Sequence, residues 1–154
     1  MKKTEKRDLE ELPQLQLDSQ LCFPLYAASR MVVNHYSPFI KPLGITYTQY
    51  VVLLSLWETG KSTVGELCER LYLDNGTMTP LLKKMEKEGL IVRNRSKKDE
   101  RVVTVHVTEE GWKLREKIKD VPYLMGKTIP LSQEEAYNLF LLLNKLLHGF
   151  ASKK

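Results

Sequence analysis

Apolar residues recur every three or four positions between residues 18 and 42, and this spacing predicts an amphipathic helix. Asp18 is the expected N-cap of this helix. Because proline is tolerated only in the first turn of a helix, Pro24 indicates that regular helix begins close to Cys22. Residues 1–16 are polar and lack a helical period, which predicts a flexible arm before a single domain at residues 17–154.

Three further helices are predicted in the centre of the chain from apolar residues at the same spacing. The first is expected to follow Thr48, and the second to be capped by Ser62 or Thr63. A turn at residues 73–76 leads into the third, which is expected to end at Gly89 because glycine suits the position after a helix. Two helices joined by a short turn form a helix-turn-helix.

The apolar period changes from helical to alternating after residue 89. Residues 90–95 and 102–107 are rich in β-branched side chains, and the polar stretch 96–101 between them predicts a β-hairpin. A helix-turn-helix followed by a hairpin predicts a winged helix-turn-helix over about residues 48–107, in a mostly helical α+β fold. The alternative is a small α+β domain whose hairpin is merely solvated.

The end of the chain predicts two more helical segments. Thr108 is expected to cap the first, and Pro122 and Pro130 to flank an irregular connection. Ser132 is expected to start a last helix with more apolar surface than its neighbours can bury, which predicts dimerisation helices at about 18–42 and 109–151. Packing against the first helix of the same chain is the alternative. The residues of the apolar face are Leu139, Leu142, Leu143, Leu146, Leu147 and Phe150.

Positive charge is concentrated in one part of the chain. Residues 83–101 contain eight basic and four acidic residues, a net charge of +4 out of the +5 of the whole chain. A basic patch of this kind favours a polyanion such as DNA, although a solvated surface has the same composition. The expected DNA contacts are Asp74, Asn75, Thr77, Thr79, Lys83 and Lys84 on the second helix of the pair, and Arg93, Arg95, Lys97, Lys98 and Arg101 on the hairpin.

Several classes of protein are not supported by the sequence. The N-terminus has no apolar segment typical of a secretory signal, and no stretch is long enough to cross a membrane, so a cytoplasmic protein is expected. Two cysteines are too few for a disulfide scaffold. No metal-ligand spacing and no phosphate-binding or dinucleotide-binding motif is present, so neither a metal nor a cofactor is predicted.

The two cysteines differ in their expected environments. Cys22 lies near the expected start of a helix, where the helix dipole stabilises a thiolate, and only the thiolate reacts quickly with peroxide. The hydroxyls of Tyr26, Tyr36 and Tyr47 could donate hydrogen bonds to that anion. The alternative is that Cys22 is an ordinary small apolar residue. Cys68 is expected in the core, because it lies on the apolar face of a short helix.

Several segments resemble the MarR family of transcriptional regulators. They are ITYTQY at 45–50, LYLDNGTMTPLLKKMEKEGLIVR at 71–93 and DER at 99–101. The segment QLCFPLYAASR at 20–30 is similar to the organic hydroperoxide resistance regulators within that family. The resemblance extends over about residues 17–119.

The resemblance implies a homodimer that binds a pseudo-palindromic operator in double-stranded DNA and represses genes. It implies that organic hydroperoxides oxidise Cys22 and that the oxidised protein leaves DNA. It also implies that Tyr36 and Tyr47 of the other subunit hydrogen-bond the Cys22 thiolate. It also implies that Asp99 orients Arg101 into the minor groove. Two features depart from, or do not match, the best-known members of this branch. Pro24 follows the LCF motif, and the C-terminal half has no cysteine, so the subgroup that forms a disulfide with a distal cysteine is not matched.

The sequence therefore predicts a dimeric, redox-sensing repressor. Peroxide would convert Cys22 to a sulfenic acid, which would then trap a low-molecular-weight thiol or become over-oxidised. One alternative is a regulator that binds a small phenolic ligand in the dimer crevice, with Cys22 not involved. Another is a thiol peroxidase-like enzyme, which is disfavoured because no resolving cysteine, histidine base or cofactor motif lies near Cys22 in the sequence.

Overall fold

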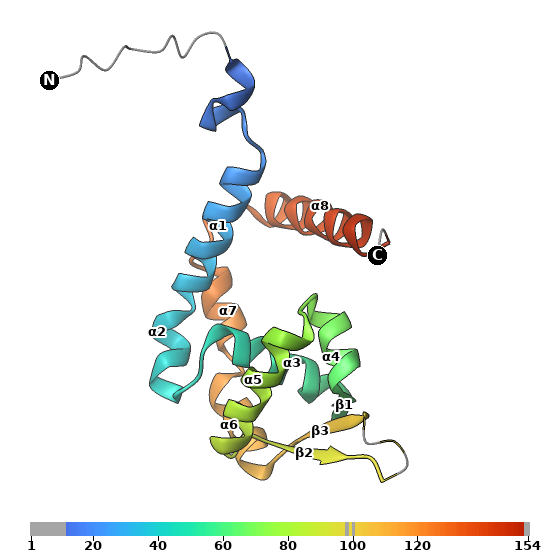
Figure 1. The fold of residues 1–154 in the computed structure, drawn as a ribbon. Coiled ribbons are helices and arrows are strands. Elements are labelled where there is room, and N and C mark those ends of the chain that lie inside the picture. Colours follow the sequence, from blue (N-terminus) through green and yellow to red (C-terminus); the bar gives the residue numbers. More distant parts are fainter. Residues whose placement is uncertain (1–11, 98, 100, 153–154) are drawn as a thin grey trace, which may run out of the picture. The chain divides into compact units, whose positions relative to one another are not determined.

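The computed structural model describes residues 12–97, 99 and 101–152. Residues 1–11 of the predicted arm lie outside this range, and Pro13–Leu15 and Leu17–Ser19 form short 3-10 helices. The chain divides into two compact units, one up to Lys119 and one from Asp120 onward (Figure 1). The first unit continues with α1 (Cys22–His35), α2 (Ser37–Ile40), a 3-10 turn (Lys41–Leu43), α3 (Tyr47–Thr59), β1 (Lys61–Thr63), α4 (Val64–Leu71), α5 (Asn75–Lys87), β2 (Ile91–Arg95), β3 (Val103–Val107) and α6 (Glu109–Ile118).

Side-chain caps determine where most of the helices begin. The hydroxyl of Thr63 accepts a hydrogen bond from the backbone N–H of Glu66 at the start of α4, and Thr108 caps α6 in the same way. Helix α3 begins slightly earlier than predicted, because Thr46 forms a capping box with Gln49. The prediction that Asp18 caps α1 was wrong: Asp18 lies in a separate 3-10 turn, and Leu21 precedes α1 with no side-chain cap.

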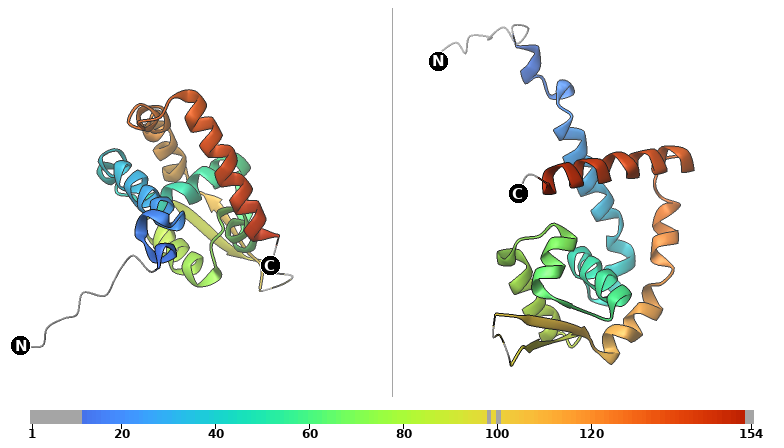
Figure 2. Two further views of the ribbon diagram at one scale, coloured as in Figure 1. Left: turned by 90° about the horizontal axis from the view of Figure 1, so that it is seen from above. Right: turned by 90° about the vertical axis from the view of Figure 1, so that its right-hand side faces the viewer.

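The sheet has three antiparallel strands in the order β1–β3–β2. The predicted hairpin is present, with Arg93 opposite Val105. Strand β1 was not predicted, because its three residues pair with β3 more than forty positions away. Figures 1 and 2 show α3, α4 and α5 on the same side of this sheet. A mostly helical winged helix-turn-helix is confirmed.

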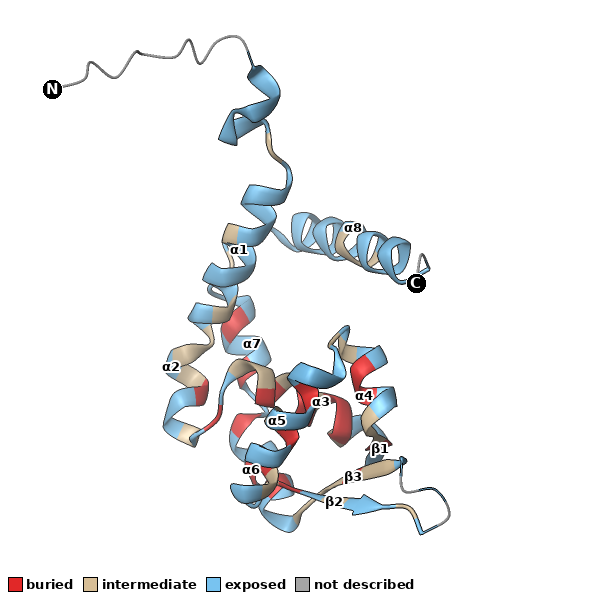
Figure 3. Cartoon of the chain, in the orientation of Figure 1, coloured by how far each residue is buried: buried red, intermediate tan, exposed pale blue. Residues whose placement is uncertain are grey.

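The core of the first unit lies between these three helices and the sheet (Figure 3). Its side chains come from every element of the winged helix-turn-helix, so the helices and the hairpin are held in fixed relative positions by shared packing. The most completely buried are Val52, Leu53, Leu56, Leu67, Met78, Leu82, Met85, Ile91 and Val105.

The second unit contains α7 (Val121–Gly126) and α8 (Gln133–Ala151). The prediction of an irregular connection between Pro122 and Pro130 was partly wrong. Pro122 occupies the first turn of α7, where a missing N–H is tolerated. Ser132 caps α8 as predicted, and α8 has no buried residue. None of the helices in the described ranges combines the length and apolar composition needed to cross a membrane.

Gly111 in α6 packs closely against the strand connections and provides a test of the core. A Cβ atom there would overlap the carbonyl oxygen of Leu90 and come within 2.7 Å of Cγ1 of Val107. The backbone cannot move freely, since the Gly111 carbonyl accepts a hydrogen bond from the Trp57 indole at 3.1 Å. We predict that Gly111→Ala lowers the free energy of unfolding by about 1–3 kcal/mol, measured by thermal or denaturant unfolding.

Gly65→Ala is the matched control, because a Cβ at this helical glycine meets no atom within 4 Å. Alanine favours helix over glycine, so this variant should be unchanged or slightly stabilised. Equal losses of stability in the two variants would contradict the packing described for Gly111.

Candidate nucleic-acid interface and thiol site

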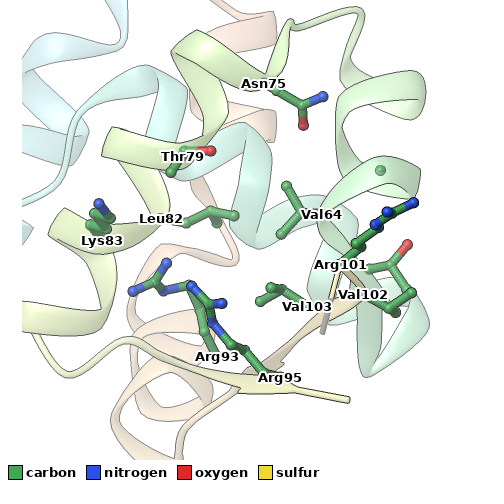
Figure 4. A pocket seen from close by; sticks show the side chains of 12 residues that line it. Val64, Asn75, Thr79, Leu82, Lys83, Arg93, Arg95, Arg101, Val102 and Val103 are labelled. Atoms are coloured by element: carbon green, nitrogen blue, oxygen red, sulfur yellow. The ribbon is translucent and has the colours of Figure 1, made fainter. Parts of the chain in front are cut away.

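A polar groove of about 610 Å³ lies between α4, α5 and the hairpin (Figure 4). Its floor is apolar and includes Leu82 and Val103. Apart from Thr63, its polar lining comes from residues that the sequence analysis predicted as DNA contacts, although they are spread over 27 positions of the chain. These residues are Asn75, Thr79, Lys83, Arg93, Arg95 and Arg101.

The first turn of α5 is stabilised by Asp74. Its Oδ1 accepts a hydrogen bond from the Thr77 backbone N–H at 2.8 Å, and its Oδ2 accepts one from the Thr77 hydroxyl at 2.9 Å. These bonds, the backbone one foremost, lower the pKa of Asp74. Asp74 and Thr77 therefore have a structural role at the start of α5, and neither lines the groove. Their predicted contacts with DNA stay predictions.

Arg93 connects the hairpin to α5 through Glu86. Its Nε and Nη2 atoms donate to Glu86 Oε2 at 3.1 and 2.7 Å, and its backbone N–H donates to Oε1 at 3.0 Å. The Arg93 side chain, followed by its backbone, lowers the pKa of Glu86. Arg93 thus holds β2 against α5. Because its guanidinium is bound to Glu86, the Arg93 side chain is less free to bind a phosphate. The sequence analysis did not identify Glu86, because the pair forms across a helix–strand connection.

The remaining cations of the groove are less constrained. Within the part of the chain that the structure describes, Lys83, Arg95 and Arg101 have no carboxylate partner, and all three are exposed. Lys84 lies 3.8 Å from Glu88 and does not line the groove. Unpaired cations on one surface create a positive potential that attracts a polyanion.

The tip of the hairpin is organised by Asp99. Its Oδ1 accepts a hydrogen bond from the backbone N–H of Arg101 at 3.0 Å, and its own N–H donates to Ser96 Oγ at 3.3 Å. Asp99 therefore orders the backbone that carries Arg101. In the part of the chain that the structure describes, the Arg101 guanidinium makes no hydrogen bond to Asp99, so the orienting role implied by the resemblance stays a prediction. Lys97 is exposed outside the groove, and Lys98 lies outside the described residues.

Cys22 is the first residue of α1, and its side chain is exposed. Tyr26 lies one turn further on, where its hydroxyl accepts a hydrogen bond from Arg30 at 3.5 Å and its ring stacks under the guanidinium. Tyr36 follows the last residue of α1, fourteen positions from Cys22. A helix of that length separates the two residues by about 21 Å. The structure therefore does not bring Tyr36 to Cys22 within one chain.

Tyr36 instead forms a cluster with Tyr47 and Tyr50, the tyrosine cluster. The ring centroids of Tyr36 lie 4.8 Å from Tyr47 and 5.7 Å from Tyr50. Burial raises the pKa of all three, and for Tyr50 burial and the two neighbouring tyrosines raise it to about 12. Their hydroxyls therefore remain protonated hydrogen-bond donors at neutral pH. The sequence analysis did not identify Tyr50 as part of this cluster, and its spacing of three from Tyr47 was the one available signal.

Cys68 lies in the core, as predicted, with 8% of its surface exposed. Its thiol donates a hydrogen bond to Asn75 Oδ1 at 3.4 Å. Burial, followed by the negative charge of Asp74, raises the pKa of Cys68. The thiol is therefore held in its unreactive protonated form. Among the described residues there is no group of three histidine, cysteine or carboxylate side chains that could hold a metal ion.

Comparison with known proteins agrees with this geometry. Residues 34–120 match the family model described as transcriptional regulator SarA/Rot. The organic hydroperoxide resistance transcriptional regulator of Bacillus subtilis is 48% identical over 125 residues, which cover 81% of this chain and 83% of the relative. The solved structure of reduced AbfR bound to DNA has a TM-score of 0.74 and 34% identity, and covers 89% of this chain and 96% of the AbfR chain. Overoxidized AbfR bound to DNA has a TM-score of 0.73, 34% identity and coverages of 88% and 96%.

The fold and these likenesses define a winged-helix transcriptional regulator. The chain belongs to the MarR family, in the branch of the organic hydroperoxide resistance regulators.

The contrast between the two cysteines generates a prediction about the reduced protein. A small aromatic disulfide reagent should label one thiol per chain rapidly, because only Cys22 is accessible, and the second thiol only on unfolding. Cys22→Ser should remove the rapid phase, and Cys68→Ser should leave it intact. Rapid labelling that persists in Cys22→Ser would contradict the burial of Cys68.

Proposed function

We propose that this protein is a homodimeric repressor that binds a pseudo-palindromic operator and releases it when an organic hydroperoxide oxidises Cys22. A redox-sensing, DNA-binding regulator is the class to which its relatives belong. The finer proposal rests on Cys22, which is an exposed thiol at the start of α1, about 21 Å along the helix from Tyr36 of its own chain. Such a repressor acts on DNA in the cytoplasm.

The groove supports a specific mode of DNA binding. Helix α5 would enter the major groove, which is wide enough for a helix, with Asn75, Thr79 and Lys83 directed at bases and phosphates. The hairpin would place Arg101 in the adjacent minor groove, where a narrow groove attracts arginine. Reduced AbfR has been solved bound to DNA, which supports the same partner for this chain.

Exposed apolar side chains support a dimer. Neither α1 nor α8 buries any residue, although both carry an apolar face, and a two-fold dimer would remove such faces from water. A second copy of the chain would also supply the tyrosine hydroxyls that hydrogen-bond Cys22. The exposed apolar residues include Phe23, Leu25, Met31 and Val32 on α1, and Leu139, Phe140, Leu141, Leu142, Leu146, Leu147 and Phe150 on α8.

The proposed sensor chemistry has two steps. The Cys22 thiolate attacks the peroxide oxygen, its sulfur becomes a sulfenic acid, and the peroxide is reduced to an alcohol. A low-molecular-weight thiol then condenses with the sulfenic acid, forming a mixed disulfide and water. Since overoxidized AbfR is found bound to DNA, we favour the mixed disulfide as the form that leaves the operator.

Release would follow from a change in the spacing of the two α5 helices. Binding to two half-sites requires recognition elements about 34–36 Å apart. Bulk added at Cys22 would repack α1 of one subunit against the tyrosine cluster of the other. A modest movement would be enough, because both half-sites must be occupied together for tight binding.

The DNA-binding mode predicts different effects for two residues of the hairpin. Arg101→Ala should weaken operator binding by about 1–3 kcal/mol, as expected for loss of a specific groove contact. Lys97→Ala should instead reduce the slope of log affinity against log salt by about one, as expected for one phosphate contact. Fluorescence anisotropy over a salt series measures both. If neither variant differs from the parent protein, the hairpin is not part of the interface.

The sensor proposal predicts that Cys22→Ser folds and binds the operator but is not released by cumene hydroperoxide in the presence of free cysteine. Serine cannot form a sulfenic acid, and Cys68→Ser is the matched control that should still respond. Gel shift and intact-mass measurement follow release and the adduct, with about one peroxide consumed per chain. Release of Cys22→Ser by peroxide would refute the proposal, and consumption of many peroxides per chain would indicate a thiol peroxidase.

A further inference from the structure

Gln49 is a buried polar residue that none of the proposed roles uses. It belongs to the first turn of α3, and none of its surface is exposed. Its Oε1 accepts a hydrogen bond from the Thr46 backbone N–H at 2.8 Å. Its Nε2 donates to Glu88 Oε2, 39 positions along the chain. Both ends of the amide are therefore occupied, and the bond to Thr46 determines which end faces Glu88.

The two hydrogen-bond partners of Gln49 belong to different helices. Thr46 caps α3, which carries two of the tyrosines, and Glu88 lies at the end of α5. Tyr47 and Tyr50 occupy the same first turn of α3 and form most of the tyrosine cluster. Glu88 directly follows the last residue of α5, the helix proposed to enter the major groove. The Gln49–Glu88 hydrogen bond thus joins the turn that carries the cluster to the end of the recognition helix.

Physical chemistry favours joint movement of the two helices at this point. A carboxylate acceptor makes this hydrogen bond stronger than a neutral pair, and breaking it would leave a fully buried amide unsatisfied. Met78, Leu82 and Met85 are spaced along α5 and are fully buried, so the helix is packed into the core over several turns and its end is not free to move by itself. The length of α5 is about 20 Å, which reaches the groove.

We propose that Gln49 is a positioning residue that transmits the state of the tyrosine cluster to the recognition helix through Glu88. It contacts neither the thiol nor DNA. Movement of the first turn of α3 on oxidation of the partner's thiol is transferred by the Gln49 amide to the end of α5. This inference rests on the proposed function, because it requires that oxidation lowers operator affinity.

The test measures the ratio of operator dissociation constants in two states of the full-length protein. One is reduced, and the other is treated with cumene hydroperoxide and free cysteine. Gln49→Met keeps the volume but removes both hydrogen bonds. We expect it to bind the operator normally when reduced, while the ratio falls about tenfold, within the range of coupling energies for such residues. Circular dichroism on melting confirms that each variant is folded.

A swapped pair provides the rescue. In Gln49→Glu with Glu88→Gln, the new carboxylate can accept from both the Thr46 backbone and the new amide, so the ratio should return toward that of the parent. Gln49→Glu alone places two carboxylates opposite each other, so the ratio should not return toward that of the parent. Lys84→Met is the matched control: it removes the other partner of Glu88, at 3.8 Å, and should weaken both states equally with no change in the ratio.

The outcomes separate the two proposals. A parent protein that oxidation does not release refutes the proposed function and this inference together. A parent that is released, with the same ratio in Gln49→Met or with no rescue by the swapped pair, overturns the inference alone.

Discussion

The length of α1 is the constraint on which the regulatory account depends. It places Cys22 at one end of a fourteen-residue helix and Tyr36 directly after the other end. Tyr36 is fixed there by its packing on Tyr47 and Tyr50, so the tyrosine cluster cannot approach the thiol of its own chain. A sensor made of these residues requires two chains, and tight binding to a two-part operator requires two chains as well. The same association would therefore create both the sensor and the DNA-binding unit.

Hydrogen bonding divides the charged residues that line the groove or support it from beside it into two groups. Glu86 holds Arg93, and Asp74 holds the first turn of α5, so these charges maintain the geometry of the groove. Lys83, Arg95 and Arg101 have no such partner in the described part of the chain, and their charge is available to phosphates. A count of basic residues does not distinguish the two groups, although only the second is expected to produce a strong salt dependence.

The sequence was most informative where structure depends on neighbours along the chain. The caps at Thr108 and Ser132 and the hairpin involve residues a few positions apart, and each was predicted. Thr63, the cap of α4, was one of the two residues expected there. Strand β1 was missed because its partner is distant. Helix α7 was missed because Pro122 was expected to flank an irregular connection, whereas it lies in the first turn of this helix.

The candidate site could likewise be predicted only where it depends on neighbours along the chain. The polar and charged residues that α5 and the hairpin contribute to the groove could be listed from their charge and their place in the motif, and Cys68 could be assigned to the core from its spacing. The partners that modify their roles could not: Glu86 for Arg93, Glu88 for Gln49 and Asn75 for Cys68 become neighbours only through tertiary packing. The roles of Cys22, Tyr36 and Tyr47 in sensing stay predictions for the same reason, since they depend on contacts between two chains.

Mixed dimers test the central claim most directly. Cys22→Ser lacks the thiol, and Tyr36→Phe with Tyr47→Phe lacks the donating hydroxyls, so each homodimer should be oxidised slowly or not at all. Refolding the two together produces dimers in which one site combines an intact thiol with the tyrosines of the other chain. Stopped-flow oxidation by cumene hydroperoxide should then show a rapid phase, at one thiol per mixed dimer. A mixture that reacts no faster than the tyrosine variant alone would contradict a sensor shared between two chains.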